Sequence, residues 1–85
     1  MLKKRIVVGL EHGLQARNAT EFVQKASIFE SDITLMKNGV SVTGKSIMGV
    51  MGSAIRKKED ITLVADGIDE QAAVKNLETF LSNKQ

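Results

Sequence analysis

Residues 32–42 read Asp-Ile-Thr-Leu-Met-Lys-Asn-Gly-Val-Ser-Val and contain the clearest local structural signal in the chain. Ile33 and Leu35 alternate with less apolar neighbours, which is the period-two pattern of a half-buried strand. Asn38-Gly39 follows, and this pair favours a type I′ turn because both of its residues accept a positive φ. The stretch therefore predicts an antiparallel hairpin, with Val40 and Val42 on the return strand.

The rest of the chain alternates between strand and helix patterns. A strand is predicted over residues 4–10 and another over residues 60–65, and a helix of about eleven or twelve residues begins at Ala16. Ser46 precedes a brief helix over residues 47–51, and Asp69 caps a last helix. The apolar positions are Ile6, Val8, Leu10, Ala16, Ala19, Phe22, Val23, Ala26, Ile61, Leu63, Ala65, Ala73, Val74, Leu77, Phe80 and Leu81. The order β-α-β-β-α-β-α predicts an α+β fold, a four-stranded antiparallel sheet with its helices on one face.

Composition limits the class of protein. The chain has 85 residues, 42% hydrophobic and 26% charged, with no Cys and no Pro. This excludes a disordered tail and a disulfide-stapled secreted domain, and it predicts one domain over residues 1–85 with one modest core.

Charge and hydropathy bear on partners and compartment. The formal net charge is +2, and the basic clusters at residues 3–5 and 56–58 border apolar segments, so direct binding of nucleic acid is not expected. Only three apolar residues follow the first basic cluster, too few for a signal peptide or a membrane helix. We expect no membrane association and a cytoplasmic protein.

No conventional catalytic or metal centre emerges from the residues. His12 is the single histidine, and without a second His or a Cys a zinc site would need three carboxylates. We interpret His12 as a solvated loop residue, and we expect no metal, no cofactor and no enzymatic activity.

Two helix starts carry more information. Gln15-Ala16-Arg17 opens the first long helix, where free N–H groups and a guanidinium favour an anion. Ser46 opens the brief helix, so a phosphate on its hydroxyl would meet free N–H groups and would be tolerated by the fold. An unmodified N-cap is the plain alternative for Ser46.

The brief helix is too short to bury all of its apolar side chains. Ile47, Met48, Val50 and Met51 follow Ser46, and we expect at least one or two of them to face solvent beside it. An exposed apolar cluster beside a charge switch is typical of a protein-docking surface. The alternative is that all four are core residues.

With these residues in view, the chain resembles the HPr family of the sugar phosphotransferase system over almost its whole length. Residues 45–51, Lys-Ser-Ile-Met-Gly-Val-Met, are similar to the regulatory serine site of HPr from Gram-positive bacteria. Residues 13–20 align with the family's active-site stretch, Gly-Ile/Leu-His-Ala-Arg-Pro-Ala. The resemblance implies an open-faced sandwich of four antiparallel strands and three helices.

Two departures from the family pattern matter. The phosphoryl-accepting histidine falls on Gln15, whose amide has no basic nitrogen to take a phosphoryl group. This substitution beside an intact serine site resembles the Crh branch of the family, the HPr-like proteins of catabolite repression in bacilli. Asn18 stands where the family has Pro, and we expect a looser first helical turn there.

The Crh resemblance implies the following roles. HPr kinase/phosphorylase would phosphorylate Ser46, and the product would act as corepressor of CcpA, a LacI-type transcription factor. The partner interface would consist of Ile47, Met48 and Met51, with Arg17 as a basic group near the phosphate and with Gln15 and Thr20 at its flanks.

Three alternatives stay open. His12 could provide residual phosphocarrier activity in place of the missing histidine. Residues 47–55 also fit the apolar-Gly-x-x-Gly-x-x-Ile outline of a KH RNA-binding domain, although Val50 and Met51 offer no polar group to a phosphate. The chain could be a monomer or, as in Crh-type proteins, a dimer that exchanges its first strand through a hinge at residues 10–13.

Overall fold

The computed structural model describes residues 1–83, and its elements follow the predicted order. The strands are β1 (Leu2–Val7), β2 (Asp32–Lys37), β3 (Val40–Thr43) and β4 (Asp60–Asp66). The helices are α1 (Ala16–Ser27), α2 (Ile47–Gly52) and α3 (Glu70–Ser82).

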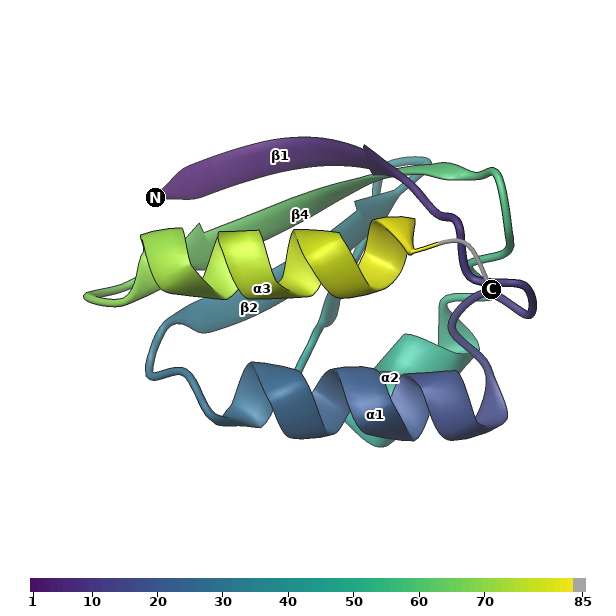
Figure 1. The fold of residues 1–85 in the computed structure, drawn as a ribbon, viewed down its shortest axis with the longest axis horizontal. Coiled ribbons are helices and arrows are strands. Elements are labelled where there is room, and N and C mark those ends of the chain that lie inside the picture. The colour runs from purple at the N-terminus through teal and green to yellow at the C-terminus, as the bar shows by residue number, and fades with distance from the viewer. Residues whose placement is uncertain (84–85) are drawn as a thin grey trace.

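The four strands form one antiparallel sheet in the order β1-β4-β2-β3. All three helices lie on the same side of this sheet, with α1 and α3 next to each other (Figure 1). The predicted open-faced sandwich is therefore confirmed.

The β2–β3 hairpin turns as its sequence predicts. Asn38 has φ +52° and Gly39 has φ +78°, the two positive values that a type I′ turn requires. Leu35 then pairs with Val42 across the hairpin, so both side chains face the helices.

The core lies between the sheet and the helices. Phe22 of α1 and Phe80 of α3 meet there with ring centroids 6.4 Å apart. The side chains that are buried completely or nearly so include Leu10, Leu14, Ile33, Leu35, Val50, Ile55, Ile61, Leu63, Leu77 and Leu81. Because these residues come from β2, β4, α2, α3 and the loops before α1 and after α2, the core joins α2 to the rest of the fold.

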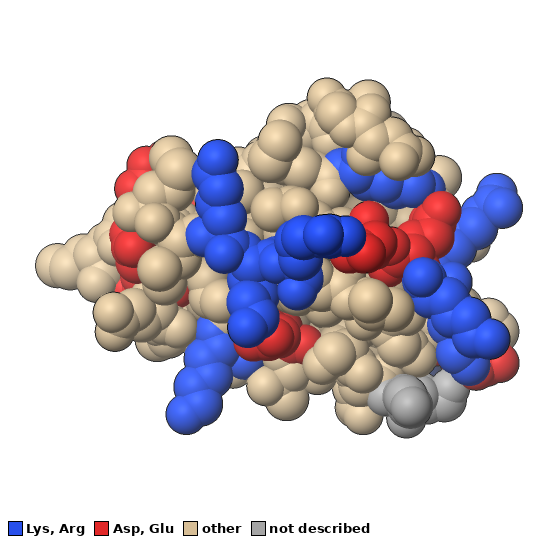
Figure 2. All heavy atoms as spheres, turned by 90° about the horizontal axis from the view of Figure 1, so that it is seen from above, with Lys and Arg blue, Asp and Glu red and all other residues tan. Residues whose placement is uncertain are grey.

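Within residues 1–83, no helix covers the opposite face of the sheet. Figure 2 looks onto this face, where Lys and Arg side chains lie among Asp and Glu; Arg5 of β1 pairs with Asp60 of β4 at 2.7 Å. Val64 is only 8% exposed here, although the alternation of β4 places it away from the helices. Its strand neighbours are Lys3 and Thr34, and the alternation alone did not predict its burial.

The first strand is shorter at its C-terminal end than we expect. The first strand ends at Val7 and not at Leu10, because the N–H of Val8 bonds to Glu59 and that of Gly9 to Leu81, which turns the chain toward α3. Val8 and Leu10 are buried as expected, but from outside the strand.

Asp69 occupies the N-cap position of α3, but its side chain does not cap that helix. Its carboxylate accepts hydrogen bonds from the N–H groups of Glu30 and Ser31 and from the Ser31 hydroxyl. These donors hold the pKa of Asp69 below its ordinary value, the Ser31 hydroxyl having the largest effect. The carboxylate therefore joins the start of α3 to the chain entering β2.

Candidate functional site

Ser46 is the N-cap of α2, as its residue type predicts. Its backbone is extended, with φ −114° and ψ 118°, and its Oγ accepts a hydrogen bond from the N–H of Gly49 at 3.1 Å. Its carbonyl accepts the N–H of Val50 at 2.9 Å. No acidic side chain lies in the first turn of α2, so negative charge on Ser46 would meet free N–H groups without a competing carboxylate.

Lys45 holds the start of α2 against the end of α1. Its ammonium donates to the carbonyl of Phe29 at 2.6 Å, and its side chain is half-buried. The sequence offered no signal for this contact, because Phe29 lies sixteen residues away in the loop after α1. The backbone on which Ser46 sits is thus attached to a second element.

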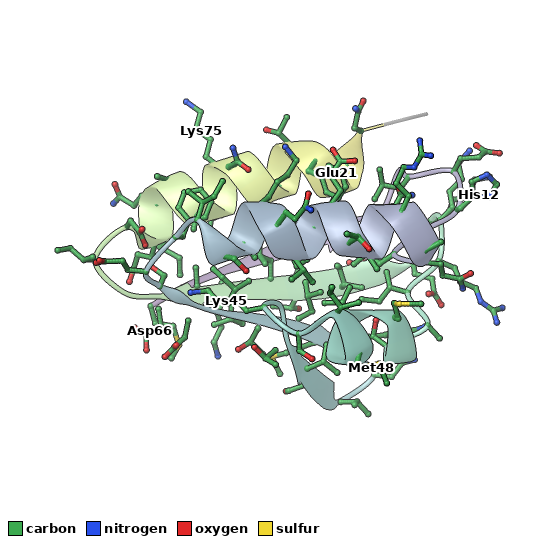
Figure 3. The ribbon with its side chains drawn as sticks, turned by 90° about the horizontal axis from the view of Figure 1, so that it is seen from below. His12, Glu21, Lys45, Met48, Asp66 and Lys75 are labelled. Carbon is green, nitrogen blue, oxygen red and sulfur yellow. The ribbon has the colours of Figure 1, made fainter. Side chains whose placement is uncertain are left out.

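Ile47, Met48 and Met51 of α2 face solvent, and we call them the α2 patch. They are 43%, 82% and 45% exposed, whereas Val50 on the same helix is fully buried. Figure 3 shows Met48 on the outer side of α2, pointing away from the molecule. The prediction that this helix exposes part of its apolar run is confirmed, and the exposed part adjoins Ser46.

The other helix start presents Gln15 and Arg17. Both side chains are exposed, Gln15 is the N-cap of α1, and its side chain makes no capping hydrogen bond. Ala16 between them has φ +48°, a left-handed conformation that is costly for a residue with a Cβ. Within residues 1–83 Arg17 forms no ion pair.

Asn18, where we expect a looser turn than a proline would give, makes two hydrogen bonds in this turn. Its N–H donates to the carbonyl of Gln15 at 3.0 Å, and its side-chain amide donates to the carbonyl of Gly13 at 2.9 Å. A proline could make neither bond, because it has neither an N–H nor a polar side chain. Asn18 therefore holds the turn with hydrogen bonds that a proline could not make.

The two helix starts lie toward opposite ends of the α1–α2 pair. Lys45 contacts Phe29 beyond the end of α1, while the N–H of Leu14, before α1, bonds to Ile55, beyond the end of α2, at 2.9 Å. The two helices therefore run antiparallel, and no hydrogen bond joins Arg17 to Ser46 among the described contacts. Thr20, the remaining predicted interface residue, is half-buried in α1 with its hydroxyl 3.4 Å from the Ala16 carbonyl.

His12 lies in the loop before α1. Its side chain is exposed at the end of the molecule where α1 begins (Figure 3), and it borders a shallow hollow shared with Gln15, Arg17 and Asn18. The neighbouring Glu11 pairs with Lys57 at 2.8 Å, and this hydrogen-bonded ammonium is the main reason that the pKa of Glu11 is lowered.

Other kinds of site find no support in the part of the chain that the structure describes. No group of three His, Cys, Asp or Glu side chains lies close enough together to hold a metal ion in residues 1–83. None of the helices described is both long and apolar enough to cross a membrane. Residues 49–52 lie inside α2, which follows strand β3, so the Gly-x-x-Gly loop between two helices that a KH domain needs is not formed.

Comparisons with known proteins agree with this geometry. A family model for the PTS HPr component phosphorylation site matches residues 2–83. The chain is 43% identical over 84 residues to the HPr-like protein Crh of Bacillus subtilis (strain 168), an alignment that covers 99% of each. The crystal structure of the phosphocarrier protein HPr from Bacillus anthracis str. Ames is similar with a TM-score of 0.92 and 42% identity, covering 94% of this chain and 95% of that one. The crystal structure of Bacillus subtilis Crh, described as a swapping domain in an intertwined dimer, has a TM-score of 0.80 at 42% identity and covers 100% of this chain and 98% of that one.

Proposed function

This chain belongs to the HPr family, and we propose that it is a non-enzymatic, regulatory member of the Crh type, one domain over residues 1–85. HPr kinase/phosphorylase phosphorylates Ser46, and the phosphorylated protein is a corepressor of a CcpA-type transcription factor of the LacI class. It works in the cytoplasm, in carbon catabolite repression, through protein contacts and without binding nucleic acid directly.

The observation that carries this proposal is the position of Ser46 at the edge of the α2 patch. Its hydroxyl is half-buried at a helix N-cap, and Ile47 and Met48 follow it with exposed side chains. Transfer of the γ-phosphoryl group of ATP forms an Oγ–P bond, releases ADP and the hydroxyl proton, and adds a charge of about −1.5 to −2. A partner that offers both an apolar contact and a basic pocket then discriminates the phosphorylated form.

Gln15 argues against a role in sugar transport. It stands at the family's phosphoryl-accepting position, where an amide cannot act as the nucleophile. Because the starts of α1 and α2 lie toward opposite ends of the antiparallel pair, we assign Arg17 to contact with the partner rather than to holding the phosphate. Gln15 and Thr20 complete that contact along α1.

Intact-mass spectrometry after two parallel incubations tests the proposal. HPr kinase with ATP should add one phosphate, mapped to Ser46 by fragmentation and absent from the Ser46→Ala variant. Enzyme I with phosphoenolpyruvate should add none; a phosphate on His12 in that arm would establish a phosphocarrier instead.

Binding of the product to the repressor provides the second half of the test. The phosphorylated protein should bind a CcpA-type repressor, and Ile47→Asp should abolish binding while phosphorylation is still measured. Equally tight binding by the unphosphorylated Ser46→Ala variant would refute the switch.

The oligomeric state is a separate proposal. The relative described as an intertwined dimer makes exchange of β1 a candidate for this chain, with residues 10–13 as the hinge. In the closed form these residues make a turn in which the N–H of Gly13 bonds to Leu10 at 3.0 Å. Sedimentation velocity over a range of protein concentrations separates the monomer from the exchanged dimer.

A further inference from the structure

We propose that Asn18 is a positioning residue that holds Gln15 and Arg17 in their partner-facing arrangement. This inference rests on the proposed function, since it assigns a cause to the geometry of the same surface. It concerns a residue at which this chain departs from the family pattern.

The turn before α1 is strained and needs to be held. Ala16 has φ +48°, and a non-glycine residue in this region persists only where its surroundings impose it. The turn begins at Gly13, with φ +60°, where an added Cβ would lie 2.2 Å from the Ile55 carbonyl oxygen. Leu14 is fully buried, and its N–H is bonded to that same carbonyl. The entry to the turn is therefore fixed by packing against the loop after α2.

Asn18 fixes the exit of the turn. Its side-chain amide reaches back to Gly13 at 2.9 Å, and its N–H bonds to Gln15 at 3.0 Å. The segment 14–17 is thus closed at both ends, and Asn18 is half-buried over it while Gln15 and Arg17 project to solvent. Without the amide, Ala16 can relax toward a negative φ, which rotates both neighbouring side chains.

Two substitutions separate positioning from general stability. Asn18→Ala and Asn18→Asp both remove the donor to Gly13, but they affect the first turn differently, because a carboxylate near a helix N-terminus is favourable and a methyl group is neutral. Asn76→Ala is the matched control, since Asn76 is exposed on α3 and its side chain has no hydrogen bond among the described residues. Unfolding in urea measures the stability of all three variants.

The readouts are the affinity of each Ser46-phosphorylated variant for a CcpA-type repressor and the three-bond HN–Hα coupling of Ala16, which reports φ. Both Asn18 variants should bind about three- to tenfold more weakly, the range expected for losing one hydrogen bond. Both should shift the Ala16 coupling, whatever their stability, while Asn76→Ala changes neither quantity.

Unchanged coupling in both Asn18 variants, or wild-type affinity despite changed coupling, would overturn the inference. If the phosphorylated wild-type protein does not bind the repressor, the proposed function fails instead. The coupling of Ala16 then still decides whether Asn18 holds the turn.

Discussion

Phosphorylation of Ser46 should stabilise the folded protein, and the structure sets the size of the effect. The Ser46 hydroxyl accepts the N–H of Gly49 at 3.1 Å, and the first turn of α2 contains no acidic residue. A phosphate there can accept the same N–H and interacts favourably with the helix N-terminus. Such a charge contributes about 0.3–1 kcal/mol at low salt. For a domain of this size that corresponds to a rise in melting temperature of roughly 1–8 °C.

Two unphosphorylated variants measure how much the Ser46 hydroxyl itself contributes to the free energy of unfolding. Ser46→Ala loses the cap and should cost about 1 kcal/mol in the free energy of unfolding. Ser41→Ala is the control, because Ser41 is an exposed serine on β3 whose side chain makes no hydrogen bond among the described residues. It should be nearly neutral.

Thermal unfolding followed by circular dichroism measures all four proteins, and amide hydrogen exchange reports on α2 directly. Exchange at Gly49 and Val50 should slow on phosphorylation, and the stabilisation should shrink at high salt because the charge is screened. A phosphorylated protein that melts below the unmodified one, or that exchanges faster at Gly49, would refute the N-cap argument.

Three further predictions concern packing, pH and the docking surface. Gly44→Ala should destabilise by about 1–3 kcal/mol in urea unfolding, since its Cβ would lie 2.6 Å from a core side chain of β2. Gly52→Ala is the control: its Cβ meets nothing within 4 Å and Ala is favoured over Gly in a helix, so it should not destabilise. Because the pKa of Asp69 is lowered in the folded state, its stabilisation is present above the ordinary aspartate pKa and is lost as pH falls through the lowered value. Asp69→Asn should therefore flatten the acid limb of a stability–pH profile, and an unchanged limb would contradict the assignment. Met48→Asp should weaken repressor binding by about tenfold or more, whereas Ile68→Asp, similarly exposed but in the loop between β4 and α3, should not. Equal losses in titration calorimetry would show that the α2 patch is not the contact.

Features that depend on a few consecutive residues were predictable. The type I′ turn needs only Asn38-Gly39 between two alternating runs, and the cap needs only Ser46 before an apolar run. In both cases the residues that determine the structure lie no more than three positions apart in the sequence. The exposure of the α2 patch followed from length, because a helix of six residues has one buried face and fills it with Val50.

Contacts between segments far apart in the chain were not predictable. Asp69 looks like an N-cap by residue type, but its carboxylate is taken by Ser31, thirty-eight residues away. Lys45 looks like a solvated charge and instead binds the Phe29 carbonyl. The residue types of Asp69 and Lys45 do not indicate these partners, because local propensity describes only the groups that a residue can reach within a few positions in the sequence.

The order of the elements, the hairpin and the serine cap could be predicted from the amino-acid sequence alone. These follow from hydrophobic periodicity and from the chemistry of single side chains. Two further features are visible only in the folded chain: the starts of α1 and α2 lie toward opposite ends of an antiparallel pair, and Asn18 closes the turn before α1. Both depend on where the buried residues of the sheet and helices bring distant backbone together, and that position is set by packing of the whole core.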